Sequence, residues 1–191
     1  DALGRTDAEG VSVASALDHL NIVPTGEGEG PAADRLHAPI EIHIEQGPHL
    51  ELAGTDIGLV TGVQAIRWLD VSIVGASGHA GTTPIGGRRD ALVSAARLIA
   101  HVAELGELVD PDIRPTVGEI AVTPNSRNVI PGSARLAIDL RHPDERVLDR
   151  AEQEIREAGA RISAASGTET RVESVLVPPA VPFDPGVLPV G

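Results

Sequence analysis

The most regular stretch of this 191-residue chain reads Trp68-Leu69-Asp70-Val71-Ser72-Ile73. Every second residue of the stretch, beginning at Leu69, is aliphatic. Because successive side chains of a strand point to opposite faces of a sheet, this period of two predicts a β-strand with one buried face.

Further segments with a strand or helix period follow in order: a helix, two strands, a second helix and a weaker fourth strand. They are residues 92–105, 118–122, 136–140, 147–158 and 171–177. We expect the second helix to end near Gly159, since glycine favours helix C-termini. The order β-α-β-β-α-β predicts the α+β class, as a ferredoxin-like sandwich with both helices on one face of a four-stranded sheet. The other face, or an edge strand, is left for a partner.

The repeating pattern also predicts domain boundaries. Residues 63–177 form the ferredoxin-like domain, whereas residues 1–62 and 178–191 belong to another part of the protein. The chain begins at Asp1 and ends in a proline-punctuated stretch. We therefore expect it to be a piece of a longer protein.

Composition narrows the class of protein. The chain is 41% hydrophobic, which is enough for a packed core, and its formal net charge is −13. An acidic surface repels nucleic acid and anionic lipid, so neither is an expected partner. The sequence has no cysteine and no apolar run of the ~20 residues that would span a bilayer. We expect a soluble, cytoplasmic protein.

The first candidate for chemistry is the motif Glu41-Ile42-His43-Ile44-Glu45-Gln46-Gly47-Pro48. On a strand from Ile40 to Ile44, His43 would share one face with the two glutamates. An imidazole between two carboxylates suits a divalent metal, because these groups are normal zinc ligands. The alternative is an amphipathic edge strand with a solvated polar face.

A second candidate is His79, which lies among small residues in Gly75-Ala76-Ser77-Gly78-His79-Ala80-Gly81-Thr82-Thr83-Pro84. A loop histidine with room for a ligand can donate a hydrogen bond to a developing oxyanion. The alternative is a glycine-rich turn with an incidental histidine. Downstream, Asp90 suits a helix N-terminus, and a structural ion pair is the better interpretation of Arg88 and Arg89.

Two further residues suit ligand binding. Asn128, in a turn between two predicted strands, offers an amide donor and a carbonyl acceptor. Arg141, at the end of a strand, could hold a carboxylate with two parallel hydrogen bonds. A turn asparagine and an outward-facing charge are the local alternatives.

Taken together, three long motifs resemble the hydantoinase/carbamoylase family, which includes N-carbamoyl-L-amino-acid hydrolases and allantoate amidohydrolases and belongs to the aminoacylase-like metallopeptidase clan. The motifs are His43 to Pro48, Gly78 to Pro84 with Arg88 to Leu92, and Asn128 to Gly132.

The resemblance implies a homodimeric enzyme whose catalytic domain holds two zinc or manganese ions, with a ferredoxin-like lid inserted into it. It implies that His43 is a metal ligand and that Gln46 lies close to the substrate. It further implies that His79 reaches the partner's site and polarises the scissile carbonyl, while Asn128 and Arg141 hold the substrate's carboxylate.

By this resemblance, the enzyme hydrolyses a C–N bond in N-carbamoyl amino acids or in ureido acids such as allantoate. The family's remaining metal ligands have no counterpart in this chain, and a catalytic zinc usually needs three protein ligands. We therefore expect the parent protein to be the enzyme and this chain alone to be inactive. The alternatives are a dimerisation or binding module without chemistry, and a metallopeptidase of the same clan.

Overall fold

The computed structural model describes residues 3–22 and 38–188, which form two compact units, Asp1–Leu52 and Ala53–Gly191. The first unit contains helix α1 (Val13–His19), which begins where the Ser12 hydroxyl accepts a hydrogen bond from the Ser15 amide at 3.0 Å. Helix α2 (His49–Ala53) begins in this unit and ends at the first residue of the second one. The predicted boundaries after residues 62 and 177 stay a prediction.

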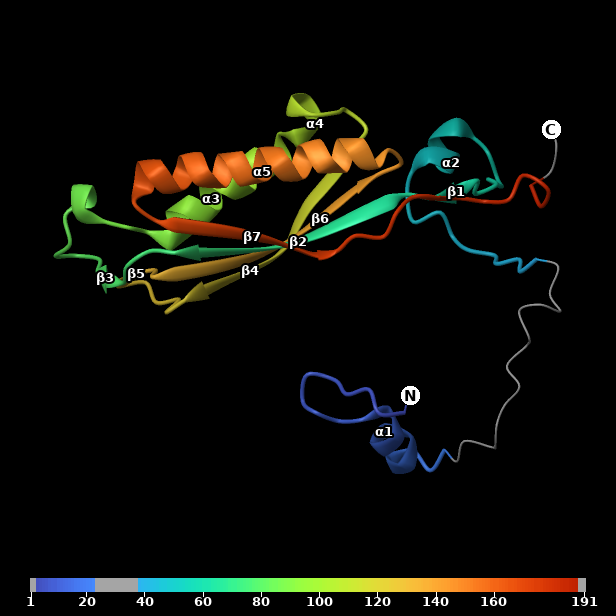
Figure 1. Cartoon of the computed structure of the whole chain (residues 1–191), viewed down its shortest axis with the longest axis horizontal. Coiled ribbons are helices and arrows are strands. Elements are labelled where there is room, and N and C mark those ends of the chain that lie inside the picture. The colour runs from blue at the N-terminus through green and yellow to red at the C-terminus, as the bar shows by residue number, and fades with distance from the viewer. Residues whose placement is uncertain (1–2, 23–37, 189–191) are drawn as a thin grey trace. The chain divides into compact units, whose positions relative to one another are not determined.

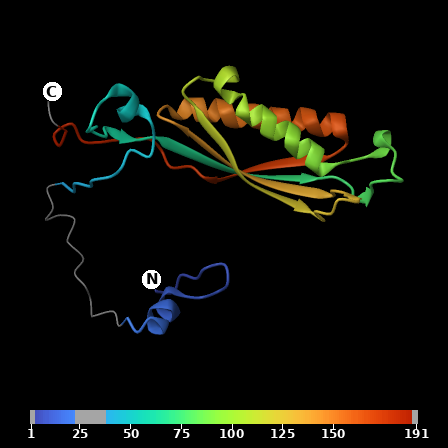
Figure 2. The same ribbon diagram turned by 180° about the vertical axis from the view of Figure 1, so that it is seen from behind.

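The second unit is built on a four-stranded antiparallel sheet, visible in Figures 1 and 2. Its strands lie in the order β4-β6-β2-β7. They are β2 (Ala65–Val74), β4 (Arg114–Thr123), β6 (Ser133–His142) and β7 (Glu169–Leu176). β2 and β6 pair along their full length, from Ala65 opposite His142 to Val74 opposite Ser133.

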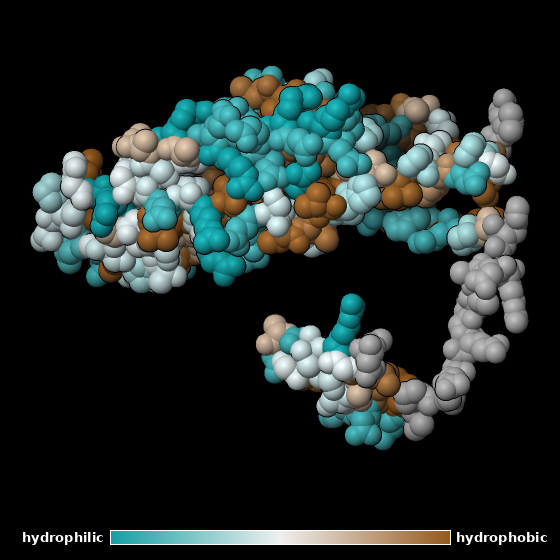
Figure 3. Space-filling view, viewed as in Figure 1, coloured by the Kyte–Doolittle hydropathy of each residue, from teal (hydrophilic) through white to brown (hydrophobic). Residues whose placement is uncertain are grey.

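Two long helices, α3 (Ala91–Ala103) and α5 (Glu145–Ser166), cover one face of this sheet (Figure 1). The core lies between them and the sheet, and it is aliphatic. Its largest fully buried side chains include Leu69, Ile73, Leu98, Ile138, Leu140, Leu148 and Ile155. Hydrophilic residues gather over the outer surface of α5 (Figure 3), as expected for an amphipathic helix with one buried stripe. The four strands and two helices predicted between residues 68 and 177 are present, and both helices lie on one face of the sheet as predicted.

Smaller elements extend the sheet at its two ends. Strands β3 (Gly78–His79) and β5 (Val129–Ile130) form a two-stranded ribbon at one end. Strands β1 (Gly62–Val63) and β8 (Val181–Pro182) pair at the other end (Figure 1). The 3-10 turn η2 (Ile85–Gly87) precedes α3, and the short helix α4 (Leu105–Leu108) follows it. No helix in the described part of the chain has the length and apolar character that crossing a bilayer requires.

Helix α5 does not end near Gly159, and that prediction was wrong. Gly159 lies inside the helix, where a Cβ would come within 3.0 Å of Thr170 Cγ2 on β7. It therefore allows a close approach of helix and strand. The helix ends instead at Gly167, whose φ of +66° is the left-handed conformation that glycine adopts without steric cost.

The predicted strand from Ile40 to Ile44 was also wrong. Residues 38–46 have no regular secondary structure, and the side chains of Ile40 and Ile42 are more than 90% exposed. A strand needs a neighbouring backbone to satisfy its hydrogen bonds, and the described residues offer this segment none. Alternation of side chains therefore did not suffice to form a strand here.

A network of charged side chains fastens β2 and β7 to α5. Glu152 on α5 accepts hydrogen bonds from Arg67 on β2, from Arg156 at 2.6 Å and from Ser174 on β7 at 2.7 Å. The Arg67 and Glu152 side chains are each 12% exposed. Burial alone would raise the pKa of Glu152, but these hydrogen bonds and the charge of Arg67 hold that pKa below its ordinary value of 4.5.

We predict that Glu152→Gln destabilises the second unit by about 2 kcal/mol at pH 7, because it removes the buried one of the two carboxylates that pair with Arg67 and leaves only the exposed Asp149. A carboxylate whose folded-state pKa is lowered adds stability above its unfolded pKa, and this is lost as pH falls below about 4.5. Urea unfolding at pH 7 and at pH 3 measures both effects. An equal difference between variant and parent at the two pH values would contradict the assignment. The exposed Glu157→Gln is the control, with an expected effect below about 1 kcal/mol.

Candidate functional site

His79 and Asn128 come together on the ribbon of β3 and β5. His79 lies opposite Val129, and the Ala80 amide donates to the Asn128 carbonyl at 3.0 Å. Both side chains are exposed. Residues 49 positions apart in sequence are thus neighbours at one end of the sheet, where each can reach a ligand from outside the chain.

The His79 imidazole is oriented by its own loop. The Gly81 amide donates to Nδ1 at 3.0 Å, so this nitrogen is the unprotonated one in the neutral ring. The ring proton is then on Nε2, which has no partner among the described residues. A neutral imidazole with a free Nε2–H is a hydrogen-bond donor that can stabilise negative charge on an oxygen.

The loop that carries His79 is held by the guanidinium of Arg88. Its Nη2 donates to the Ala80 carbonyl at 2.7 Å and its Nε to the Thr83 carbonyl at 3.1 Å. The expected ion pair of Arg88 or Arg89 is wrong, because neither pairs with a carboxylate among the described residues. Asp90 does cap α3, as predicted, by accepting from the amides of Leu92 and Val93.

Close backbone contacts join the ribbon to the sheet. A Cβ on Gly75, just after β2, would lie 2.0 Å from the Arg89 carbonyl oxygen, and one on Gly132 would lie 2.4 Å from Ser77 Oγ. The Ala76 amide donates to the Arg89 carbonyl at 2.8 Å. The small residues of this motif therefore serve close packing of the backbone around the ribbon.

Asn128 has one side of its amide already engaged. The Ser126 hydroxyl donates to Oδ1 at 2.7 Å, which leaves the Nδ2 donors for a ligand. An amide so oriented can donate to a carboxylate or a carbonyl oxygen.

Arg141 lies at the opposite end of the sheet. It is next to the last residue of β6, opposite Ile66. Arg141 is eight residue steps along β6 from Ser133, which corresponds to roughly 26 Å at about 3.3 Å per step. A small molecule that touches Arg141 therefore cannot reach His79 or Asn128 of the same chain.

Arg141 lines a cavity and is paired with a neighbouring carboxylate. The guanidinium lines a cavity of about 320 Å³ together with Val60, Gly62, Val63, Gln64 and Ile66. Asp139 accepts from its Nε at 3.1 Å and from Nη2 at 2.8 Å, and this hydrogen bonding raises the pKa of Arg141. Because Asp139 occupies the Nε edge of the fork, Nη1 stays available to a second acceptor.

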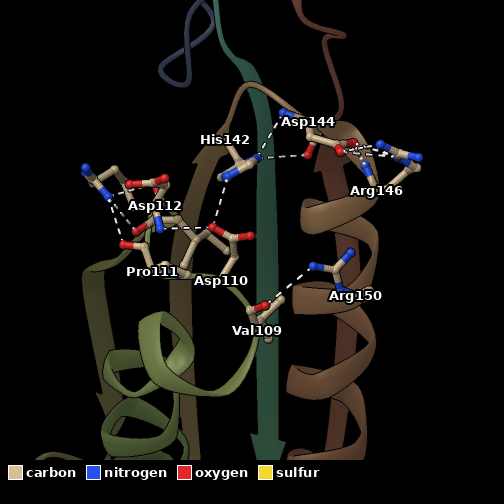
Figure 4. Close-up of polar contacts among 10 residues, drawn as sticks. Val109, Asp110, Pro111, Asp112, His142, Asp144, Arg146 and Arg150 are labelled. Atoms are coloured by element: carbon tan, nitrogen blue, oxygen red, sulfur yellow. Dashed lines mark hydrogen bonds and ion pairs between the residues drawn. The ribbon is translucent and has the colours of Figure 1, made fainter.

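The neighbouring His142 is a buried anchor for this end of β6, which the sequence reasoning missed (Figure 4). Its Nδ1 accepts from the Asp144 amide at 2.9 Å, and its Nε2 is 3.4 Å from Asp110 Oδ1 after α4. Asp144 caps α5, and the hydrogen bond from Arg146 lowers its pKa to about 2. The one sequence signal for this role is the period of two in β6, which puts His142 on the same buried face as Leu140.

His43 and Gln46 lie in the first unit. The His43 side chain is exposed, and its Nδ1 is 2.5 Å from the Ile44 carbonyl, which leaves Nε2 as the nitrogen that could bind a metal. Glu45 does not join it, because its carboxylate accepts from the amides of His49 and Leu50 at 2.9 and 3.0 Å. Gln46 is exposed and has a φ of +54°.

The described residues do not by themselves offer a metal site with three protein ligands. Within the described ranges, no three histidine, aspartate or glutamate side chains gather in a way that could hold a metal ion. A catalytic zinc site normally has three protein ligands. The side chains in these ranges therefore do not fit a complete metal centre.

Comparison with known proteins identifies the second unit. A family model described as a peptidase dimerisation domain matches residues 61–164, more than half of the chain. The chain belongs to this family. The matched range of the peptidase dimerisation domain includes His79, Asn128 and Arg141, and it contains β2, β4, β6, α3 and all but the last two residues of α5.

Relatives of this peptidase dimerisation domain protein confirm the resemblance to hydantoinase/carbamoylase amidases. The chain is 35% identical to an N-carbamoyl-L-amino-acid amidohydrolase of Rhizobium meliloti and 33% identical to an allantoate amidohydrolase of Bacillus subtilis. Each match covers 96% of this chain and 44% of the relative. A crystal structure of a hydantoinase/carbamoylase family amidase from Burkholderia vietnamiensis matches with a TM-score of 0.81 and 38% identity, over 97% of this chain and 44% of that one. The chain thus spans less than half the length of these relatives.

We predict that Gly75→Ala loosens the ribbon, because its Cβ would collide with the Arg89 carbonyl oxygen. The expected loss is about 2 kcal/mol of unfolding free energy, the usual cost of forcing an extra methyl into a packed site. Urea denaturation measures it, with Gly86→Ala as the control since nothing lies within 4 Å of a Cβ there. Equal stability of the two variants would contradict the close approach.

Proposed function

We propose that this chain is part of a metal-dependent amidohydrolase that cleaves a C–N bond of N-carbamoyl amino acids or of ureido acids such as allantoate. The observation that carries the proposal is the exposed His79, whose Nδ1 is engaged by its own loop so that Nε2–H faces outward as a donor. The names of the relatives support the substrate class.

The second unit would then act as a ferredoxin-like lid. Its four long strands and two long helices follow the order β-α-β-β-α-β, and the strand order β4-β6-β2-β7 with both helices on one face supports this topology. A lid of this kind closes over substrate and excludes water.

His79 would stabilise the transition state when water attacks the ureido carbon. As water adds to this carbon, negative charge builds on its oxygen, and Nε2–H of His79 would stabilise that charge by a hydrogen bond. The C–N bond then breaks and the amine leaves. His43 would be one ligand of a metal centre of zinc or manganese that activates the water when bound. This centre needs ligands beyond His43, because no three potential metal ligands gather among the residues that the structure describes.

Arg141, Asn128 and Gln46 would bind the substrate. The free Nη1 of Arg141 and the Nδ2 of Asn128 suit the carboxylate that these substrates carry, and Gln46 would lie close to it. A guanidinium at this position would favour acidic substrates despite the net charge of −13.

The length of the sheet supports a site that is shared by two protomers. Arg141 is roughly 26 Å from the ribbon in its own chain. We therefore propose that His79 and Asn128 together enter the site of the partner, whereas Arg141 serves the site of its own protomer.

Strand β4 offers the surface for such a homodimer. It is an edge of the sheet, and among the described residues it pairs only with β6. An unpaired edge exposes backbone donors and acceptors to another chain, and a two-fold dimer can join two such edges.

The substrate class is tested with the full-length protein loaded with zinc or manganese. We expect hydrolysis of N-carbamoyl-L-amino acids or allantoate, and a fall of about 100-fold or more in kcat for His79→Ala, the usual cost of losing a donor to the oxyanion. The rate of product formation at saturating substrate measures kcat for the parent and the variant. Cleavage of dipeptides alone would favour a peptidase, and a fully active His79→Ala enzyme would contradict the assigned role.

Sharing of the site is tested by mixing inactive variants. A mixture of His79→Ala and Arg141→Ala subunits should recover about one quarter of full activity, since half the dimers are mixed and each has one intact site. The matched control is a mixture of His79→Ala and Asn128→Ala, which leaves no intact site and should stay inactive. Recovery in both mixtures would place Asn128 with Arg141 instead of with His79, and no recovery in the first mixture would overturn the shared site.

A further inference from the structure

We propose that Arg88 is a positioning residue that holds His79 in its donor orientation through the peptide unit between Ala80 and Gly81. This inference rests on the proposed function, in which His79 donates to the substrate oxygen. Arg88 itself touches neither metal nor substrate in this account.

One peptide unit connects the two side chains. Its carbonyl, that of Ala80, accepts from Arg88 Nη2 at 2.7 Å. Its N–H, that of Gly81, donates to His79 Nδ1 at 3.0 Å. Because the peptide unit is planar and trans, the carbonyl and the N–H point in opposite directions. Arg88 and His79 therefore bind opposite sides of the same rigid plane.

The second bond of Arg88 fixes the other end of the loop. Its Nε donates to the Thr83 carbonyl at 3.1 Å, while the Thr83 amide donates to the His79 carbonyl at 3.1 Å. The guanidinium is partly buried and holds two carbonyls three residues apart from one planar group. A lysine has the charge but not the fork, so it cannot hold both at these positions.

This arrangement strengthens the bond that selects the tautomer of His79. The positively charged Arg88 guanidinium donates to the Ala80 carbonyl oxygen and so polarises the peptide unit. The Gly81 N–H becomes a better donor as a result, since hydrogen bonds in a chain reinforce one another. The Gly81 N–H then keeps Nδ1 as an acceptor and Nε2 protonated. The fit is close as well: a Cβ on Gly81 would lie 3.2 Å from Cε1 and 3.4 Å from Nδ1 of His79.

The neighbouring Arg89 provides a matched control. Its side chain is exposed and forms no hydrogen bond or ion pair among the described residues. Arg89→Gln therefore makes the same change in charge one residue away without touching the loop.

The first arm of the test is NMR of the imidazole nitrogens of the 191-residue chain, with His79 assigned by His79→Gln. We expect a protonated Nε2 and an unprotonated Nδ1 in the parent chain and in Arg89→Gln at a pH where the ring is neutral. In Arg88→Gln we expect a mixture of the two tautomers, and in Arg88→Lys an intermediate result. Gly81→Ala should displace the ring while Arg88 is intact. Identical tautomers in Arg88→Gln and the parent chain would overturn the proposal.

The second arm is kinetics of the full-length protein on its N-carbamoyl or ureido substrate. Arg88→Gln should lower kcat by about tenfold or more with little change in KM. The reason is that a misplaced Nε2–H of His79 no longer stabilises the oxygen charge that develops in the transition state. Arg88→Lys should recover part of the loss, and Arg89→Gln should match the parent. Melting curves identify any variant that fails to fold, and Gly81→Ala then provides the second perturbation of His79. Equal kcat values for the Arg88 and Arg89 variants would overturn the proposal.

The two arms separate this inference from the proposed function. If His79→Ala keeps full activity, the assigned role of His79 fails, yet the NMR arm still decides whether Arg88 controls its tautomer. If His79→Ala is inactive and Arg88→Gln is unaffected in both arms, the proposed function stands and the role of Arg88 is refuted.

Discussion

Antiparallel pairing of β2 with β6 is the interaction on which the rest of the second unit depends. The two ten-residue strands pair from end to end, and their shared apolar face lies beneath α3 and α5. The same pairing fixes the places of the functional groups, because the ribbon with His79 and Asn128 continues one end of the pair and Arg141 stands at the other. A rigid sheet of this length separates these groups by more than a small substrate can span. The proposed dimer follows from that constraint.

The polar contacts at the two ends differ in kind. At the Arg141 end, side chains pair with side chains, as in Asp139 with Arg141 and Glu152 with Arg67. At the ribbon end, most of the hydrogen bonds involve backbone amides and carbonyls. Glycines such as Gly75 and Gly132 allow main-chain segments to pack closely there. The His79 ring is held by a backbone amide, and that amide's own peptide unit is held by Arg88. Orientation at the ribbon therefore depends on loop conformation as much as on side chains.

Much of the fold could be predicted from the sequence because its periodicity was strong. Alternation in β2 and β6 and the apolar stripes of α3 and α5 reflect burial on one side, which local pattern records directly. The end of α5 was predicted wrongly at Gly159, because a glycine that allows close packing inside a helix cannot be told from a terminal glycine by sequence alone. The prediction of a strand from Ile40 to Ile44 failed because the sequence of one segment does not show whether another backbone will pair with it. The candidate residues were found by motif, but the nearness of His79 to Asn128 and their distance from Arg141 required the sheet topology.

The central claim is that one site draws residues from two protomers, and the mass of the chain in solution tests this most directly. Light scattering after size-exclusion chromatography at micromolar concentration measures that mass independently of shape. We expect twice the chain mass of 19.7 kDa, and a lower mass for a variant with proline introduced in β4, where it interrupts edge pairing. A parent chain that is strictly monomeric at these concentrations would contradict a site shared through this domain.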